Sequence, residues 1–246
     1  MPWANAPPYP NDAIRASRAA GQLAAACHTA RETGRRSLQA RWLPWCRQFD
    51  AAAGRRYRHV MIALLSPAKT LDFERPLPPL MASTPYFAKE ARSLAKSAAN
   101  LTQKRLSELM HISPRLAKLN ADRFRDFAHL PERPALYAFA GDIYTGFEVD
   151  TLDEAGVAFA QDHVRMLSGL YGLLRPLDAI RPYRLEMGTR WAPRHKRLTD
   201  WWDDRIAQLL RAQLAQEGSG VVLNLASQKY FAALAGRLAG MRVIDV

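Results

Sequence analysis

Residues 166–188, MLSGLYGLLRPLDAIRPYRLEMG, constrain the fold more than any other part of the chain. Glycine permits turns and proline biases the residue before it away from helix, so this spacing excludes one long helix. We expect a set of turns here, with a short strand-like run at residues 183–187. Arg175 and Arg181 each precede a proline, which places two guanidinium groups on extended or turning backbone.

The charged side chains of this segment favour an anionic ligand. Three arginines lie near only two acids, and the five residues are Arg175, Asp178, Arg181, Arg184 and Glu186. Guanidinium groups in fixed positions suit phosphate or another oxyanion. Alternatively, these arginines pair with the two acids or with Asp142 and hold loops together, because structural ion pairs and ligand sites look alike in a sequence.

The composition indicates a mildly basic globular protein. The chain has 246 residues and a net charge of +12, but residues 1–60 hold ten Arg, no Lys and three acids, which leaves +5 for the rest. Such a balance favours a polyanionic partner. Cys27 and Cys46 both lie in the first sixty residues, which fits a reducing, cytoplasmic setting. No apolar run approaches the roughly 18 residues that a membrane span needs.

Residues 1–60 differ from the rest of the chain. They are rich in Pro, Ala and Arg and show no sustained helical or strand period. We expect a disordered extension upstream of a functional start at Met61, followed by one domain at residues 61–246. A transit peptide and a basic arm that holds nucleic acid are the alternatives.

Short apolar runs predict buried strands at residues 61–65, 135–140, 221–225 and 242–246. The first three lead into the polar loops SPAKT, GDIYTG and NLAS. Ligands gather at the carboxyl ends of strands in open α/β sheets, so the loops are expected to line one cleft. The fold class is therefore mixed α/β, a single domain with a central β-sheet flanked by helices. The expected ligand-binding residues are Ser66, Lys69, Thr70, Asp142, Tyr144, Arg175, Arg181, Tyr183, Arg184, Glu186, Asn224 and Ser227.

Local signals also predict helices. One begins near Pro85, a second is capped by Thr102, and a third opens at Ser113 with proline in its first turn. Thr151 and Glu154 have the spacing of a capping box, which predicts a helix ending near residue 166.

The second and third helices, joined at residues 111–113, have the layout of a helix-hairpin-helix. Such a unit binds DNA phosphates through free N–H groups at a helix start and nearby cations, without reading bases. The expected DNA contacts are Lys104, Arg105, Ser113, Arg115 and Lys118. Against this hypothesis, the connection lacks a Gly-x-Gly turn, and Lys118 has the spacing to pair with Asp122 instead.

Residues for metal or nucleophile chemistry are scattered. His111, His129, His163 and His195 do not recur at metal-ligand spacing, so no metal or other cofactor is expected. The chain also offers no defensible Ser-His-Asp order.

Taken together, SPAKT, GDIYTG, residues 167–188 and NLAS with Tyr230 resemble the bacterial YaaA family of peroxide stress proteins over residues 61–246. The resemblance implies a cytoplasmic protein that limits free intracellular iron and oxidative DNA damage, and our first hypothesis is that it acts as a DNA-binding stress protein without catalysing a reaction. It also implies binding to duplex or branched DNA without sequence preference, through a helix-hairpin-helix and a basic cleft.

Relatives continue beyond the position of Val246, so the resemblance implies that the domain lacks its C-terminal part. An enzyme acting on a phosphorylated or nucleotide substrate is the alternative function. Its cleft would combine Lys69, Asp142, Arg181, Arg184 and Glu186, with carboxylates for acid–base chemistry and cations that hold a small anionic ligand.

Overall fold

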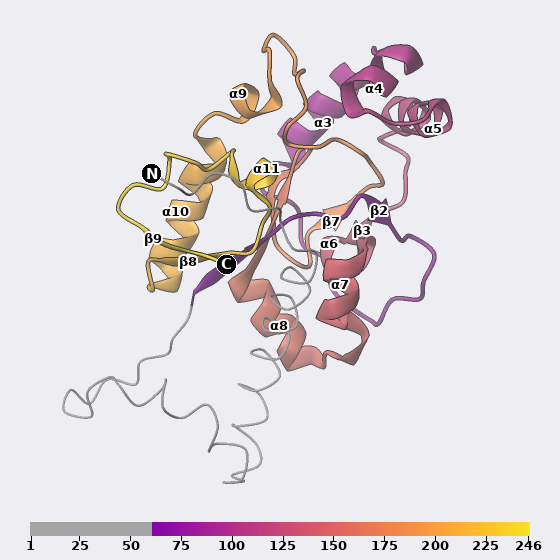
Figure 1. Ribbon diagram of the computed structural model, residues 1–246. Coiled ribbons are helices and arrows are strands. Elements are labelled where there is room, and N and C mark those ends of the chain that lie inside the picture. Colours follow the sequence, from indigo (N-terminus) through magenta and orange to yellow (C-terminus); the bar gives the residue numbers. More distant parts are fainter. Residues whose placement is uncertain (1–60) are drawn as a thin grey trace, which may run out of the picture.

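The computed structural model describes residues 61–246, and our expectations for residues 1–60 lie outside this range (Figure 1). A five-stranded sheet with the order β6-β5-β1-β8-β9 forms its centre. The neighbouring strands β5, β1, β8 and β9 are parallel, and β6 pairs with β5 in the antiparallel sense. Their bounds are Ile62–Leu65 for β1, Val164–Ser168 for β5, Gly172–Leu174 for β6, Val221–Asn224 for β8 and Arg242–Asp245 for β9.

Helices surround this sheet, which confirms the predicted mixed α/β class. They are α3 (Ala88–Ala98), α4 (Gln103–Met110), α5 (Pro114–Arg125), α6 (Ala135–Ala138), α7 (Asp142–Phe147), α8 (Glu154–His163), α9 (Leu198–Trp202), α10 (Arg205–Glu217) and α11 (Gln228–Phe231). In Figure 1, α3, α4 and α5 form a group at one end of the molecule, away from β8 and β9. The helical group and the outer parallel strands are therefore separate parts of the surface.

Two small antiparallel sheets hold the loops around the central sheet. The strand β2 (Thr70–Leu71) pairs with β4 (Phe139–Ala140), and β3 (Arg133–Pro134) pairs with β7 (Ala179–Ile180). The first pairing joins the segment after β1 to the segment before α7. It brings Thr70 of SPAKT beside Ala140, the residue before GDIYTG, although the two are about seventy residues apart in the chain.

Large apolar side chains fill the space between the sheet and the helices. Trp202, Tyr137, Phe124 and Phe139 are among the largest fully buried side chains. Burial of such aromatic residues is a main source of stability in a domain of this size. In the part of the chain that the structure describes, no helix has the length and apolar character to cross a membrane.

The predicted starts of α4 and α5 are confirmed at the level of hydrogen bonds. The Thr102 hydroxyl accepts a hydrogen bond from the amide of Arg105, and the Ser113 hydroxyl accepts one from the amide of Leu116. Pro114 occupies the first turn of α5, where its missing N–H costs nothing. These local signals were sufficient because a helix cap depends on neighbouring residues alone.

The expected strand at residues 135–140 is wrong for most of its length. Residues 135–138 form the helix α6, and only Phe139 and Ala140 belong to a strand. Every residue of α6 is buried, and a short, fully buried apolar run has neither helical nor strand period. The expected loop at residues 141–146 is wrong as well, since α7 begins at Asp142.

The expected helix at residues 151–166 begins and ends differently. Asp153, not Thr151, caps α8 by accepting a hydrogen bond from the amide of Gly156, and Thr151 lies in the short 3-10 helix Val149–Thr151. The helix ends at His163, and β5 follows at once. Residues 166–188 are therefore more than turns, because they include most of β5, all of β6 and β7 (Ala179–Ile180). Residues 183–187 form no regular strand.

A buried arginine explains why β5 was missed. Arg165 lies in the middle of this fully buried strand, where the sequence pattern favours apolar residues. Its guanidinium donates to the side-chain oxygen of Gln213 at 2.7 Å and to the backbone oxygen of Gln161 at 2.9 Å. Hydrogen bonds to other parts of the fold therefore make this charge tolerable inside the protein.

Candidate functional site

Polar groups meet at the carboxyl ends of β1 and β8, which are neighbouring parallel strands. The Ser66 hydroxyl lies 3.2 Å from the Ser227 hydroxyl and accepts a hydrogen bond from the Ser227 amide at 2.9 Å. The Tyr144 hydroxyl, which comes from α7, donates to the backbone oxygen of Ser66 at 2.9 Å. The three sequence blocks expected to converge are thus in direct contact at Ser66.

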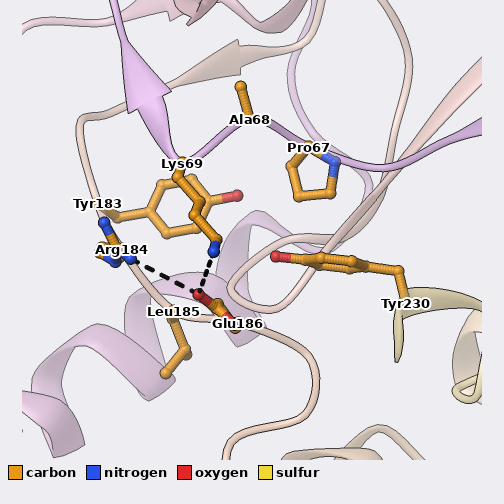
Figure 2. A pocket seen from close by; sticks show the side chains of 8 residues that line it. All are labelled: Pro67, Ala68, Lys69, Tyr183, Arg184, Leu185, Glu186 and Tyr230. Atoms are coloured by element: carbon orange, nitrogen blue, oxygen red, sulfur yellow. Dashed lines mark ion pairs between the residues drawn. The ribbon is translucent and has the colours of Figure 1, made fainter. Parts of the chain in front are cut away.

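A small hollow lies beside this contact point, with Glu186 in it (Figure 2). Its walls come from three separate segments and consist of Pro67, Ala68, Lys69, Tyr183, Arg184, Leu185, Glu186 and Tyr230. Figure 2 shows the ammonium group of Lys69 and the guanidinium of Arg184 directed toward the carboxylate, with the Tyr230 hydroxyl on the facing side. The turn after β1 and residues 183–186 thus supply most of the wall.

Glu186 is the electrostatic centre of the hollow. Its side chain is 13% exposed, and one carboxylate oxygen lies 3.7 Å from a terminal nitrogen of Arg184 and 4.0 Å from the Lys69 nitrogen. The other oxygen accepts a hydrogen bond from the ammonium group of Lys229. Three cations therefore surround one carboxylate, which leaves this group of four side chains with an excess of positive charge.

Two neighbouring side chains add hydrogen-bonding groups. The Nε atom of Arg184 is buried and has no hydrogen-bond partner among the described residues. Tyr230 is partly buried, and its burial, together with the nearby negative charge of Glu186, raises the pKa of the hydroxyl. At neutral pH the hollow therefore offers a phenolic O–H donor as well as the ammonium and guanidinium groups.

Two of the arginines that the sequence analysis selected lie outside the hollow. Arg175 pairs with the buried carboxylate of Asp178 at 3.1 Å. Arg181 binds Glu132 at 2.8 Å and donates to the backbone oxygen of Phe127 at 2.7 Å. For Arg175 and Arg181, the observed geometry is that of the alternative interpretation, in which arginines hold loops together.

The remaining predicted ligand residues are spread around the sheet edge. Asn224 donates to the carboxylate of Asp245 at 2.8 Å and ties β8 to β9, and Thr70 lies in β2. The side chain of Asp142 lies outside what the structure describes. Lys229, in contrast, contacts Glu186 but was not predicted, and its only signal was its position shortly after NLAS.

Buried tyrosines hold residues 181–183 against the core. Tyr183 and Ser168 share a hydrogen bond of 2.6 Å, and the rings of Tyr183 and Tyr171 lie 5.5 Å apart. The Tyr171 hydroxyl accepts a hydrogen bond from the backbone amide of Arg181. Burial raises the pKa of Tyr171 to about 12 and raises the pKa of Tyr144 and of Tyr183 well above the ordinary value.

We therefore expect alkaline pH to destabilise the protein through these tyrosines. Their pKa is higher in the folded state than in the unfolded chain. Their contribution to the free energy of unfolding is therefore complete below about pH 10 and is lost as the pH rises further. Tyr171→Phe removes one such group and should reduce the loss between about pH 8 and pH 11 by about 1 kcal/mol. Urea unfolding at both pH values measures this, and equal losses in the wild type and the variant would contradict it.

The predicted DNA contacts lie on a second, separate feature, the pair of helices α4 and α5. His111 ends α4 in the left-handed conformation with φ of 50°, which lets the chain turn into α5 within three residues. Lys104 and Arg115 are exposed and form no ion pair with a described residue. Arg105 lies 3.4 Å from Glu108, whereas Lys118 pairs with Asp122 at 2.9 Å, as the alternative interpretation expected.

Positive charge is concentrated on this part of the chain. Residues 88–125, which span α3, α4 and α5, carry nine Lys and Arg against three acids, a net charge of +6. Residues 61–246 as a whole carry only +5. The rest of the described domain is therefore close to neutral. The net charge of the domain as a whole does not reveal this concentration.

The fold and these two features define a mixed α/β protein with a cation-rich hollow and a basic group of helices. Residues 61–246 match the family described as peroxide stress protein YaaA. The chain is 61% identical over 175 residues to a UPF0246 protein of Rhizorhabdus wittichii, a match that covers 71% of this chain and 69% of the relative. It is 50% identical over 190 residues to a UPF0246 protein of Roseobacter denitrificans, a match that covers 75% of this chain and 72% of that relative. The chain belongs to the YaaA family of peroxide stress proteins, which confirms the resemblance.

Proposed function

We propose that this peroxide stress protein binds DNA without sequence preference through the surface of α3, α4 and α5. The observation that supports this proposal most strongly is the net charge of +6 on residues 88–125, compared with +5 for residues 61–246 as a whole. Cations gathered on one surface release counterions from DNA when they contact phosphates, and this supplies most of non-specific affinity. The rest of the domain is close to neutral in net charge, so its overall attraction for a polyanion is weaker.

The geometry of the α4–α5 connection supports the same surface. The first N–H groups of a helix have no acceptor within the helix. In α5, Pro114 has no N–H and the Leu116 amide donates to the Ser113 hydroxyl, so the Arg115 amide is the first-turn donor left for a phosphate oxygen. Arg115 lies in this first turn, and Lys104 lies in the first turn of α4. Contacts of this kind fix the position of the DNA backbone and do not read the bases.

Charge reversal tests this proposal. K104E/R115E should weaken binding to both duplex and branched DNA by about tenfold or more, since each substitution replaces an attraction with a repulsion. The matched control is K196E/R197E, which changes the net charge equally at two exposed residues outside α3, α4 and α5. Fluorescence anisotropy at about 50 mM and 200 mM salt measures affinity and its salt dependence. Equal weakening by both double variants would show that only total charge matters and would rule out this surface.

At the level of the cell, we propose that binding protects DNA under hydrogen peroxide and that the protein limits free iron. A peroxide-sensitive strain without its own family member can be complemented with the wild type or with K104E/R115E. We expect the variant to lose protection of DNA against strand breaks. Chelatable iron, measured in the same cells by electron paramagnetic resonance, tests whether iron is lowered independently of DNA binding.

The alternative function is catalysis on a phosphorylated or nucleotide substrate, and it would use the hollow around Glu186. The observation that favours it is the group of cations and donors gathered there from three segments. Lys69→Ala separates the two functions, because Lys69 lies outside α3, α4 and α5. Loss of peroxide protection with DNA affinity intact would support the alternative.

A further inference from the structure

We propose that the hollow around Glu186 is a binding site for a small phosphate-class oxyanion, which competes with the Glu186 carboxylate for Lys69 and Arg184. This site is distinct from the helical surface assigned to DNA above. The ligand would be a free phosphate, a phosphate monoester or a phosphate of a nucleic acid, all of which present the same charged oxygens.

The ion pairs of Glu186 with Lys69 and Arg184 are incomplete. The distances of 4.0 Å to Lys69 and 3.7 Å to Arg184 are well beyond the roughly 2.7–2.9 Å of a charge-assisted hydrogen bond. Both cations therefore keep hydrogen-bond donors that the carboxylate does not use. The strongest contact of Glu186 is instead with Lys229, which holds the other carboxylate oxygen.

Arg184 gives an independent sign that an acceptor belongs here. Its side chain is 19% exposed, and its Nε atom is buried without a hydrogen-bond partner among the described residues. Burying a donor without an acceptor is unfavourable, and native proteins generally avoid it. An oxyanion held between Lys69 and Arg184 could supply the acceptor oxygen that Glu186 does not supply.

The shape of the hollow explains why Glu186 would compete with the ligand. With Glu186 in place, the free space in the hollow is no more than that of about one water molecule, so a tetrahedral oxyanion needs part of the volume of this carboxylate. Lys229 binds the other carboxylate oxygen of Glu186 and can retain the displaced carboxylate. The Tyr230 hydroxyl, directed into the hollow in Figure 2, is a further donor to the ligand.

Three variants test the competition, with inorganic phosphate as the probe and chloride at equal ionic strength as the reference. Phosphate should raise the Tm of the wild type, because a ligand of the folded state stabilises it. Lys69→Ala should weaken phosphate binding about tenfold, whereas Glu186→Gln should strengthen it about tenfold by removing a like charge at nearly constant volume. Lys196→Ala, an exposed lysine outside the hollow, is the control and should behave as the wild type.

The same variants identify the source of the phosphate. If the ligand is a free phosphate compound, Lys69→Ala and Glu186→Gln leave DNA affinity unchanged, and phosphate displaces DNA no better than chloride does. If the ligand is a DNA phosphate, Lys69→Ala weakens DNA binding and Glu186→Gln strengthens it, as they do for phosphate. Either of these two results supports the site.

Phosphate that stabilises the wild type no more than chloride would overturn the proposal. Equal phosphate affinity in Lys69→Ala, Glu186→Gln and the wild type would also overturn it. Lys69 is 69% exposed, so its truncation should not prevent folding, and circular dichroism of each variant checks this directly. The result with K104E/R115E is independent of these outcomes, so failure of this site and failure of the DNA-binding surface can be told apart.

Discussion

Gly169→Ala should lower the free energy of unfolding by about 3 kcal/mol or more, one of the two largest effects expected of a single substitution in this domain. A Cβ atom at position 169 would lie 2.2 Å from the backbone oxygen of Leu185, a distance that non-bonded atoms do not reach. The clash is with backbone, so no side-chain rotation relieves it. The chain around Leu185 would have to move, and Glu186 with it, which should also disturb the hollow.

Gly156→Ala is the matched control for this substitution. A Cβ atom there would meet only side-chain atoms, at 3.2 Å from Asp153 and 3.3 Å from Leu152. These atoms can shift slightly, and alanine also favours the helix by up to about 1 kcal/mol. Urea unfolding followed by circular dichroism compares the two variants. A Gly169→Ala midpoint equal to that of Gly156→Ala would mean that the close approach to Leu185 does not stabilise the fold.

Trp202→Ala should cost a comparable amount, about 3–5 kcal/mol. The Trp202 side chain is completely buried, its indole N–H donates to the backbone oxygen of Gly169 at 2.9 Å, and its ring contacts Phe87 with centroids 5.1 Å apart. The substitution therefore leaves a large cavity and an unsatisfied carbonyl. It also removes the ring that packs over Gly172, where any Cβ atom would lie within 3.0 Å of it.

The neighbouring tryptophan provides the control. Trp201 is only partly buried, and the Arg205 guanidinium lies 4.2 Å from the centroid of its ring. An exposed cation–π contact contributes about 0.5–1 kcal/mol, so Trp201→Ala should cost much less than Trp202→Ala. Thermal or urea unfolding of both variants measures the two losses of stability. Similar losses in the two would contradict the central packing role assigned to Trp202.

The parts of the fold that depend on local signals could be predicted from the sequence. The strands β1, β8 and β9 were predicted because each is a short apolar run next to polar or glycine-containing segments. The starts of α4 and α5 were predicted because a capping hydroxyl acts on an amide only three residues away. The convergence of the SPAKT and NLAS loops followed from the parallel order of the strands that precede them.

Errors occurred where distant residues decide the local structure. The strand β5 contains Arg165, whose charge is accommodated by hydrogen bonds to Gln213 and Gln161, and no local pattern reveals these partners. Arg181 and Arg184 look equivalent in the sequence. Only the folded chain shows that Glu132, from 49 residues away, engages the first while the second lines the hollow.

The most direct measurement of the central claim is a backbone NMR titration of residues 61–246 with a short duplex DNA. We expect the largest chemical-shift changes in α4, the 111–113 connection and the first turn of α5, with Lys104 and Arg115 among the affected residues. Changes should be small in β8 and β9, which lie away from this helical group (Figure 1). Saturable DNA binding that leaves the signals of residues 102–118 unchanged would contradict the assignment of DNA binding to these helices.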